Sequence, residues 1–209
     1  TLGNGNGNGN GNSGTGNNVT VDQEGMNDTA TVTQAGFSNE AVVLQGEFSY
    51  DNTIVINQSG HHNYAGASTD SGGFSTVTIN QTGHHNEVNN KPDGSSFYGE
   101  GLGAGTWGGD NVVTVDQDGH HNKAYADAAD LSSIIDIDQS GQHNEAYAES
   151  VWGEANEIVI DQTGSEHLAE VYVSGAGSNM VYVTQTDINN SAVVSSIGFG
   201  NTVTITQGM

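Results

Sequence analysis

Glutamine recurs along the chain at multiples of one short interval, and this regularity limits the possible fold more than any other feature. Successive glutamines of the set are separated by 11, 11, 13, 23, 36, 22, 23, 23 and 22 residues. The set is Gln23, Gln34, Gln45, Gln58, Gln81, Gln117, Gln139, Gln162, Gln185 and Gln207. Self-similarity at a fixed period predicts a repeat architecture in which each unit packs only on its neighbours.

Each unit reads as one strand followed by a tight turn. In residues 133–146, SIIDIDQSGQHNEA, the side chains of Ile135, Ile137 and Gln139 share one parity, and the alternation restarts at Asn144 after a turn that contains Gly141. Strict alternation is the period of a half-buried strand. Glycine at a fixed turn position supplies a positive φ without steric cost. The sequence therefore predicts strands that alternate with short turns.

The strands fall into two kinds, one with large inward residues and one with small ones. The large pairs are Ile54/Ile56, Val77/Ile79, Val113/Val115, Ile135/Ile137, Ile158/Ile160, Val181/Val183 and Val203/Ile205, and the small pairs are Ala65/Ala67, Ala124/Ala126, Ala146/Ala148, Ala169/Val171 and Ala192/Val194. Sheets about 10 Å apart leave room for one large and one small side chain. We predict an all-β fold: a β-solenoid of about eight stacked two-strand rungs of 22–23 residues each.

The solenoid is expected to span residues 17–209. A Gly-rich segment at 93–110, which follows Lys91 and Pro92, is expected to leave the stack as a surface loop, since proline cannot continue a ladder. The Gly/Asn-rich segment 1–16 has two interpretations. It is a flexible linker, or it is a degenerate extra strand whose Asn6, Asn8 and Asn10 point inward.

Composition excludes several classes of protein. Only 33% of the residues are hydrophobic and 31 are glycine, which is little for an ordinary globular core. The net charge is −23, with Lys91 and Lys123 as the basic residues, so binding to nucleic acid or to anionic membranes is disfavoured. The chain lacks cysteine, and no apolar run approaches the ~20 residues of a membrane helix, so no membrane insertion is expected. A first residue other than Met fits a secreted protein whose signal peptide has been removed.

The amides at the two ends of each strand share the parity of the aliphatic residues, so we expect them to point inward. Identical amides stacked in register can hydrogen-bond along the stack. This predicts structural ladders formed by Asn52, Gln58, Asn63, Gln81, Asn86, Asn111, Gln117, Asn122, Gln139, Asn144, Asn156, Gln162, Asn179, Gln185, Asn190, Asn201 and Gln207.

Two other sets of residues are candidates for divalent metal ligation. Stacked rungs would align the turn residues His61, His62, His84, His85, His120 and His121 along one edge. They would also align the outward carboxylates of Asp116, Asp138 and Asp161, whose oxygens suit Ca²⁺. The alternative for both sets is a solvated polar surface without a bound ion.

No catalytic constellation or cofactor site is apparent in the sequence, and no cofactor is expected. No nucleophile elbow, phosphate-binding loop or isolated carboxylate pair stands out from the repeat. Ice binding would favour a regular array of outward threonines, but the outward mid-strand position runs Thr78, Thr114, Asp136, Val159 and Tyr182. A structural protein and a monomeric solenoid adhesin or binding module remain the two main hypotheses.

The repeat resembles a known motif. Ser133, five residues, then Gln139-x-Gly141-x-x-Asn144-x-Ala146 is similar to the curlin repeat, S-x5-Q-x-G-x-x-N-x-A. A second copy begins at Ser75, with Val88 in place of alanine, whereas Asn52, Asn156 and Asn201 replace the serine elsewhere.

This resemblance implies a subunit of curli, the bacterial functional amyloid of the biofilm matrix. Curlins are exported unfolded through an outer-membrane pore, and the Gly/Asn-rich start of the chain is similar to their export-recognition segment. The resemblance further implies an extracellular, cell-surface fibre with cross-β order. Its partners would be other copies of the chain stacked head to tail, a dedicated exporter and a nucleator.

Overall fold

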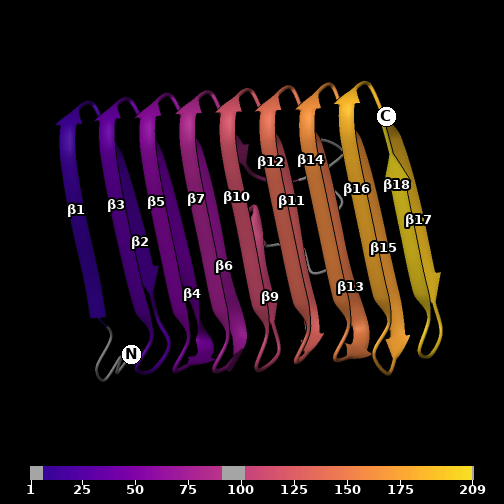
Figure 1. Cartoon of the computed structure of the whole chain (residues 1–209). Helices are drawn as coiled ribbons and strands as arrows, with labels where there is room; N and C mark the ends of the chain where they lie inside the picture. The colour runs from indigo at the N-terminus through magenta and orange to yellow at the C-terminus, as the bar shows by residue number, and fades with distance from the viewer. Residues whose placement is uncertain (1–6, 91–101, 209) are drawn as a thin grey trace.

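The chain folds into a straight β-solenoid built from two parallel sheets (Figure 1). The computed structural model describes residues 7–90 and 102–208. Those residues form 18 strands and no helix, so no helix long and apolar enough to cross a membrane occurs among them. The chain alternates between the sheets and makes about eight turns. The predicted fold class is confirmed.

The first sheet holds nine strands in sequence order. They are β1 (Gly7–Thr15), β3 (Thr29–Phe37), β5 (Thr53–His61), β7 (Thr76–His84), β10 (Val112–His120), β12 (Ile134–Gln142), β14 (Glu157–Ser165), β16 (Met180–Ile188) and β18 (Thr202–Gln207). Every pair in this sheet is parallel and free of register shifts, so equivalent repeat residues always lie side by side.

The second sheet faces the first and also contains nine strands. They are β2 (Asn18–Gln23), β4 (Glu40–Tyr50), β6 (Tyr64–Gly73), β8 (Glu87–Val88), β9 (Ala104–Trp107), β11 (Lys123–Leu131), β13 (Glu145–Glu154), β15 (Leu168–Ala176) and β17 (Ser191–Ile197). β8 and β9 both lie between β6 and β11, so the sheet has eight rows.

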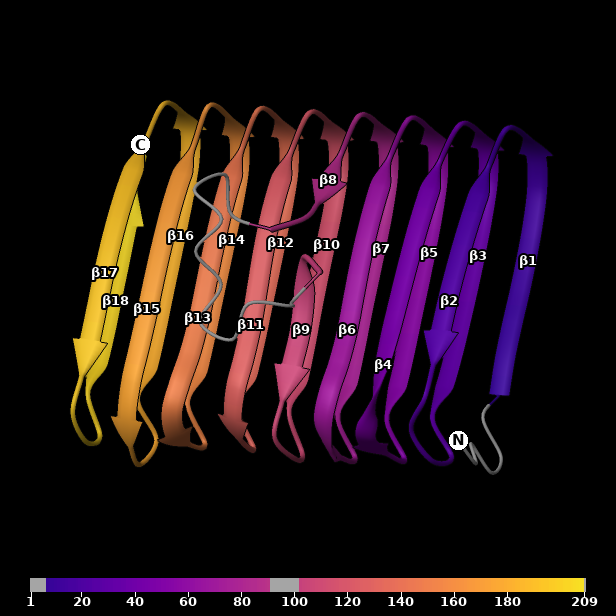
Figure 2. The same cartoon turned by 180° about the vertical axis from the view of Figure 1, so that it is seen from behind.

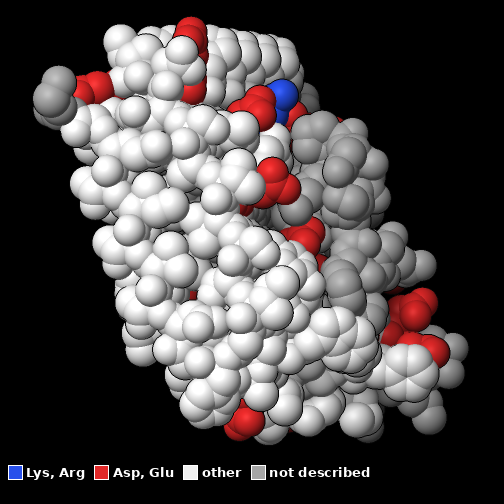
Figure 3. Space-filling model, turned by 90° about the vertical axis from the view of Figure 1, so that its right-hand side faces the viewer, with Lys and Arg blue, Asp and Glu red and all other residues white. Residues whose placement is uncertain are grey.

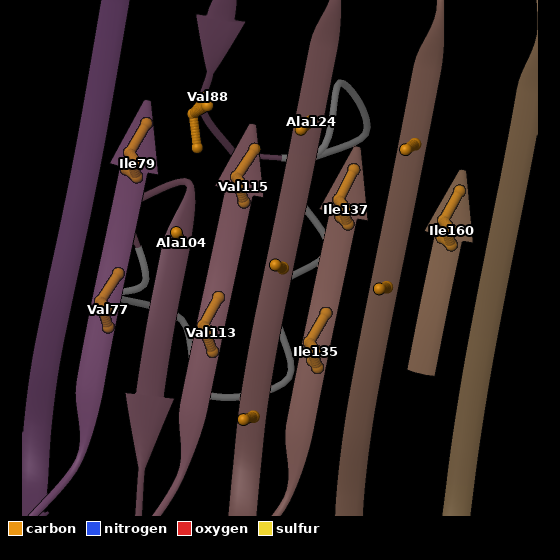
Figure 4. Close-up of a cluster of buried hydrophobic side chains, with 14 of the residues drawn as sticks. Val77, Ile79, Val88, Ala104, Val113, Val115, Ala124, Ile135, Ile137 and Ile160 are labelled. Atoms are coloured by element: carbon orange, nitrogen blue, oxygen red, sulfur yellow. The ribbon is translucent and has the colours of Figure 1, made fainter. Parts of the chain in front are cut away.

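One continuous core fills the space between the sheets. Large residues of the first sheet, such as Ile135 and Ile137, are fully buried, as are the alanines of the second sheet. Figure 4 shows Val113 and Val115 in line with Ile135 and Ile137 on neighbouring strands. Burying each valine or isoleucine contributes about 1.5–3 kcal/mol. A rung buries these side chains fully only when another rung lies on each side of it. The stabilisation from burial therefore depends on stacking.

The Gly-rich segment 93–110 does not leave the stack entirely, which corrects the surface-loop prediction. Its residues Ala104–Trp107 return to the second sheet as β9, in the same row as the two-residue β8 (Figure 2). The physical reason is packing: without β9, the lower half of that row would be an open slot between β6 and β11. Ala104 fills the slot and is fully buried. Lys91, Pro92 and the rest of the segment up to residue 101 lie outside the described residues.

The amino-terminal tract contributes a strand. Gly7–Thr15 form β1, which pairs in parallel with β3 over nine residues, from Gly7 opposite Thr29 to Thr15 opposite Phe37. Asn8 and Asn10 take the rows of Ala30 and Val32. Asn6, and the side chains of Asn8 and Asn10, lie outside the described residues, so their predicted orientation stays a prediction.

The turns that leave the first sheet are set by a column of glycines with positive φ. Gly141 has φ 122°, and a Cβ at this position would lie 1.9 Å from the carbonyl oxygen of Gly164 in the next rung. Any side chain would therefore separate two rungs. The column holds a close backbone contact that only glycine permits.

A substitution in this column tests the stacking geometry. We expect Gly141→Ala to destabilise the solenoid by several kcal/mol, because both the positive φ and the contact with Gly164 oppose a Cβ. Gly11→Ala is the matched control, since its Cβ would make only ordinary contacts of 3.7 Å with Thr33. Urea unfolding of the soluble protein measures both. Equal stability of the two variants would contradict this account of the turn.

Candidate functional site

A ladder of glutamine side chains runs along one edge of the core. The Nε2 of each glutamine donates to the Oε1 of the glutamine in the next rung, at 2.8 or 2.9 Å, from Gln34 to Gln207. The members in order are Gln34, Gln58, Gln81, Gln117, Gln139, Gln162, Gln185 and Gln207. The seven members from Gln34 to Gln185 are no more than 2% exposed, and the last member, Gln207, is half-buried.

The same amides also join the two sheets. Nε2 also donates its second hydrogen to a backbone carbonyl at the start of the preceding strand, which lies in the second sheet, as Gln139 does to Lys123 at 2.9 Å. Gln58 and Gln162 make the equivalent bonds to Glu40 and Glu145. A buried amide without partners would cost about 1–3 kcal/mol. The ladder avoids that cost and fixes the register of both sheets.

Asparagines form a second ladder at the turn from the first sheet to the second. The Oδ1 of each accepts the backbone N–H of the equivalent residue in the next rung, as Asn122 does from Asn144 at 3.1 Å. Its Nδ2 donates to the carbonyl of a turn glycine, Gly141 in the case of Asn122. The bonds run through Asn17, Asn39, Asn63, Asn86, Asn122, Asn144, His167 and Asn190.

His167 occupies an asparagine position in this ladder, a role that the sequence reasoning did not assign. Its Nδ1 lies 3.2 Å from the backbone nitrogen of Asn190 and accepts that N–H, while its Nε2 lies 3.2 Å from the carbonyl oxygen of Thr163. The imidazole thus reproduces the acceptor and the donor of an asparagine. The signal for this role was its spacing, since His167 stands where the other repeats have asparagine.

A third ladder lines the opposite turn and accepts mixed residue types. Its members are Asp28, Asn52, Ser75, Asn111, Ser133, Asn156, Asn179 and Asn201, each of which accepts a backbone N–H from the next at 2.8–3.2 Å. The structure thus places all seventeen amides named from the sequence in these three ladders. Asp28, Ser75 and Ser133 were not among them, because the prediction considered amides only. These residues can replace asparagine here because aspartate and serine also have a side-chain oxygen that accepts a hydrogen bond.

The turn histidines form two stacked columns outside the core. His61, His84 and His120 make the first column, with ring centroids 3.4 and 4.9 Å apart, and Phe37 stacks on His61 at 4.6 Å. The second column continues from His62 through His85 and His121 to His143, with centroids 4.9–5.0 Å apart. Face-to-face stacking places the ring nitrogens in parallel planes instead of directing them at one point.

Desolvation lowers the pKa of His61, and the neighbouring imidazole of His84 lowers it further. The pKa of His121 is lowered by desolvation and by His143. Neutral rings are favoured in these columns because protonation would place like charges on adjacent rungs. Metal binding by the histidines stays a prediction.

The outward carboxylates also stack as the period requires. Asp116, Asp138 and Asp161 are direct neighbours on β10, β12 and β14. Burial raises the pKa of Asp138, and Asp161 and Asp116 raise it further. Asn80 donates to Asp116 at 2.6 Å and so begins the column with a neutral partner. Within the described ranges, no group of three or more His, Asp or Glu side chains has an arrangement suited to one metal ion.

An acidic cluster on the second sheet was not anticipated. Asp127 is 6% exposed and lies next to Glu149 on the neighbouring strand, which is 7% exposed. Burial raises the pKa of Asp127 to about 7, and the charge of Glu149 adds to the rise, while the Tyr125 hydroxyl, 3.4 Å away, opposes it. This burial was not expected from the sequence, because Asp127 has outward parity.

The two ends of the stack are open sheet edges whose strands carry a single charged residue, Asp22 of β2. Residues 1–21 and 188–209 contain no Asp, Glu, Lys or Arg, although the whole chain has a net charge of −23. Figure 3 shows the end formed by β17 and β18, where most of the described surface is neither acidic nor basic and the acidic residues form small scattered groups. Open edges expose unpaired backbone groups to which another strand can bind.

The repeat pattern agrees with one protein family. The curlin-associated repeat matches residues 13–36, 51–83 and 153–186. The chain contains curlin-associated repeats. No curated protein shows significant sequence similarity to it. The three matches include the whole of β2, β5, β6, β14 and β15 and parts of the strands next to them, so they contain Gln-x-Gly turns and ladder positions of the kind described above.

The glutamine ladder of the curlin repeats can be tested by substitution. Gln139→Leu removes the partners of Gln117 and Gln162 and one bond between the sheets, so we expect a loss of about 2–5 kcal/mol in unfolding free energy. Gln142→Ala, in an exposed turn of the same repeat, should change it by less than about 0.5 kcal/mol. Similar losses for both variants would show that the ladder contributes little.

The raised pKa of Asp127 predicts a pH dependence of stability. Between its ordinary value of 3.8 and about 7, the folded state binds a proton that the unfolded state releases, so stability falls as pH rises through this window. Asp127→Asn should remove this dependence and stabilise the protein at pH 8 by up to about 4 kcal/mol. Asp118→Asn, in an exposed turn, controls for the loss of one negative charge. Urea unfolding between pH 4 and 8 measures both, and parallel curves for Asp127→Asn and the parent would contradict the assignment.

Proposed function

We propose that the protein is a curli-like structural subunit that assembles head to tail into an extracellular fibre. The observation that carries this proposal is the pair of open sheet edges at the two ends of an in-register stack, on which Asp22 of β2 is the one charged residue of the end strands. A contact between two different surfaces of identical subunits does not close on itself and propagates as a filament. The curlin-associated repeats support the same assignment.

The ladders give the end surfaces their specificity. At the end formed by β17 and β18, Val203 and Ile205 are only half-buried, whereas their equivalents inside the stack are fully buried. At the other end, Val19 and Val21 of β2 are half-buried in the same way. Stacking a second copy would bury these four side chains and extend each hydrogen-bonded ladder by one subunit. Both effects favour addition of a copy of the same chain.

The distribution of charge favours growth along the stack axis only. All 25 acidic residues lie between residues 22 and 187 of the sequence, and most of those that the structure describes lie on the strands and turns between the two ends of the stack. Like charges on the sides oppose lateral association of stacks in low salt. The ends, with Asp22 as the one charged residue of their strands, largely lack this repulsion. The expected assembly is a thin filament with strands perpendicular to its axis.

Secretion, a dedicated exporter and a nucleator belong to this proposal by analogy with curlins. Their basis is the presence of curlin-associated repeats and the Gly/Asn-rich start of the chain. No cofactor and no catalytic step are part of the proposed function. The main rival is a monomeric solenoid that acts as an adhesin or binding module.

Fibre formation by the purified protein tests the proposal. We expect filaments with a cross-β reflection near ~4.8 Å and growth that is accelerated by preformed seeds. Ile205→Asp places a charge on the inward side of the end strand and should stop elongation, whereas Thr163→Asp adds the same charge at an exposed turn in mid-stack and should not. A parent protein that stays monomeric at high concentration would contradict the proposal and favour the adhesin.

A further inference from the structure

The two sheets do not end in the same row, and this mismatch affects how copies can stack. In the described chain the first sheet has nine rows, from β1 to β18, and the second has eight, from β2 to β17. If β18 of one copy pairs with β1 of the next, one row of the second sheet is missing at every junction. If β18 instead takes the place of β1 and pairs with β3, both sheets continue without a gap.

We propose that β1 is a placeholder strand, and that β18 of a second copy displaces it from β3 when the subunits join. This inference rests on the proposed function and specifies its interface. The occupant of the β3 edge in the fibre is therefore the last strand of an identical chain. Three independent features of the structure support the exchange.

The first is an unsatisfied amide next to β1. The Oε1 of Gln34 is buried and has no hydrogen-bond partner in the described part of the chain, although every later member of the ladder accepts a bond there. The residue opposite Gln34 on β1 is Asn12, whose side chain is one methylene shorter. With β18 on β3, the Nε2 of Gln207 could donate to the Oε1 of Gln34, as the Nε2 of Gln162 donates to the Oε1 of Gln185 inside the stack. A buried unpaired acceptor is costly, and the exchange removes that cost.

The second is the match between β18 and β3. Aligning the repeats places Val203, Ile205 and Gln207 over Ala30, Val32 and Gln34 on the inward side. On the outward side, three threonines of β18 meet three threonines of β3, namely Thr202 with Thr29, Thr204 with Thr31 and Thr206 with Thr33. Paired threonines are favourable neighbours on adjacent strands. The register that continues the ladders thus also pairs apolar residues and glutamines on the inward side and threonines on the outward side.

The third is the composition of β1. Its sequence, GNGNGNSGT, contains no aliphatic side chain, and glycine and asparagine are both unfavourable in strands. Release of β1 breaks its backbone hydrogen bonds to β3, and β18 of the second copy then forms backbone hydrogen bonds to β3 in their place. The opposite exchange, in which β1 of one copy displaces β18 of another, would expose Val203 and Ile205 and break the bond between Gln185 and Gln207. β1 is therefore the strand that leaves.

The second sheet fits the same junction. With β18 on β3, the end strand β17 meets β2 of the next copy, so that Ala192 and Val194 pair with Val19 and Val21. The buried hydroxyl of Ser196, which has no partner in the described chain, comes into the row of Gln23. No charged residue of β17 faces the one carboxylate of β2, Asp22.

Disulfide trapping tests the exchange, because the natural chain has no cysteine. Fibres are grown from mixtures of two single variants, one of them ¹⁵N-labelled, and are then oxidised, dissolved and analysed by mass spectrometry. Thr33→Cys mixed with Thr206→Cys should give a cross-link between copies, because the exchange makes these exposed positions neighbours. Gly11→Cys mixed with Thr206→Cys should give none. The reverse result, or the absence of both cross-links in fibres, would overturn the proposal.

A kinetic test uses the same pairing within one chain. Gly11 and Thr33 are opposite residues on β1 and β3, so the double variant G11C/T33C locks the placeholder strand in place. Seeded elongation should be lost on oxidation and restored on reduction. T31C/V55C, which locks β3 to β5, should elongate under both conditions. Undiminished growth of the oxidised G11C/T33C variant would refute the exchange while leaving the proposed fibre intact; failure of the parent to form fibres would instead refute the proposed function.

Discussion

The structure depends on the parallel, in-register stacking of chemically equivalent residues. In such a stack each side chain lies beside the equivalent residue in the rung above and the rung below, so residue types that bind or pack against their own kind are favoured. Glutamine and asparagine satisfy this condition because one amide both donates and accepts. This explains why the bonds from Gln34 to Gln207 run through the whole body. The aliphatic residues satisfy it by close packing.

The same stacking constraint limits where ionisable side chains can be placed. Burial raises the pKa values of Asp138 and Asp127, and the neighbouring carboxylates of the stack raise them further. In the stacked histidine columns, desolvation together with the neighbouring imidazoles lowers the pKa of His61 and His121. The end strands carry one charged residue, Asp22 of β2, so little charge repulsion opposes the addition of another copy. A repeat that stabilises the subunit therefore also prepares it for extension.

Most of the fold could be predicted from the sequence because period and parity determine it. The spacing of the glutamines predicted the length of each rung, and the alternation of residues predicted which side chains point inward. Ile135 and Ala146 accordingly lie in the core. Features that depend on a single departure from the repeat were not predictable. β9 returns to fill the row left short by β8, and Asp127 is buried despite its outward parity. His167 serves as an asparagine because its ring nitrogens happen to fall at the amide positions.

The most direct test of in-register stacking is solid-state NMR of fibres grown from protein labelled only in its glutamine side chains. The structure predicts through-space contacts between the side-chain nitrogen of one glutamine and the side-chain carbonyl carbon of the next, with amide protons that exchange slowly with water. These signals should come from all members of the ladder between Gln34 and Gln207. Side-chain amides that exchange as fast as free glutamine, without contacts between rungs, would contradict the account.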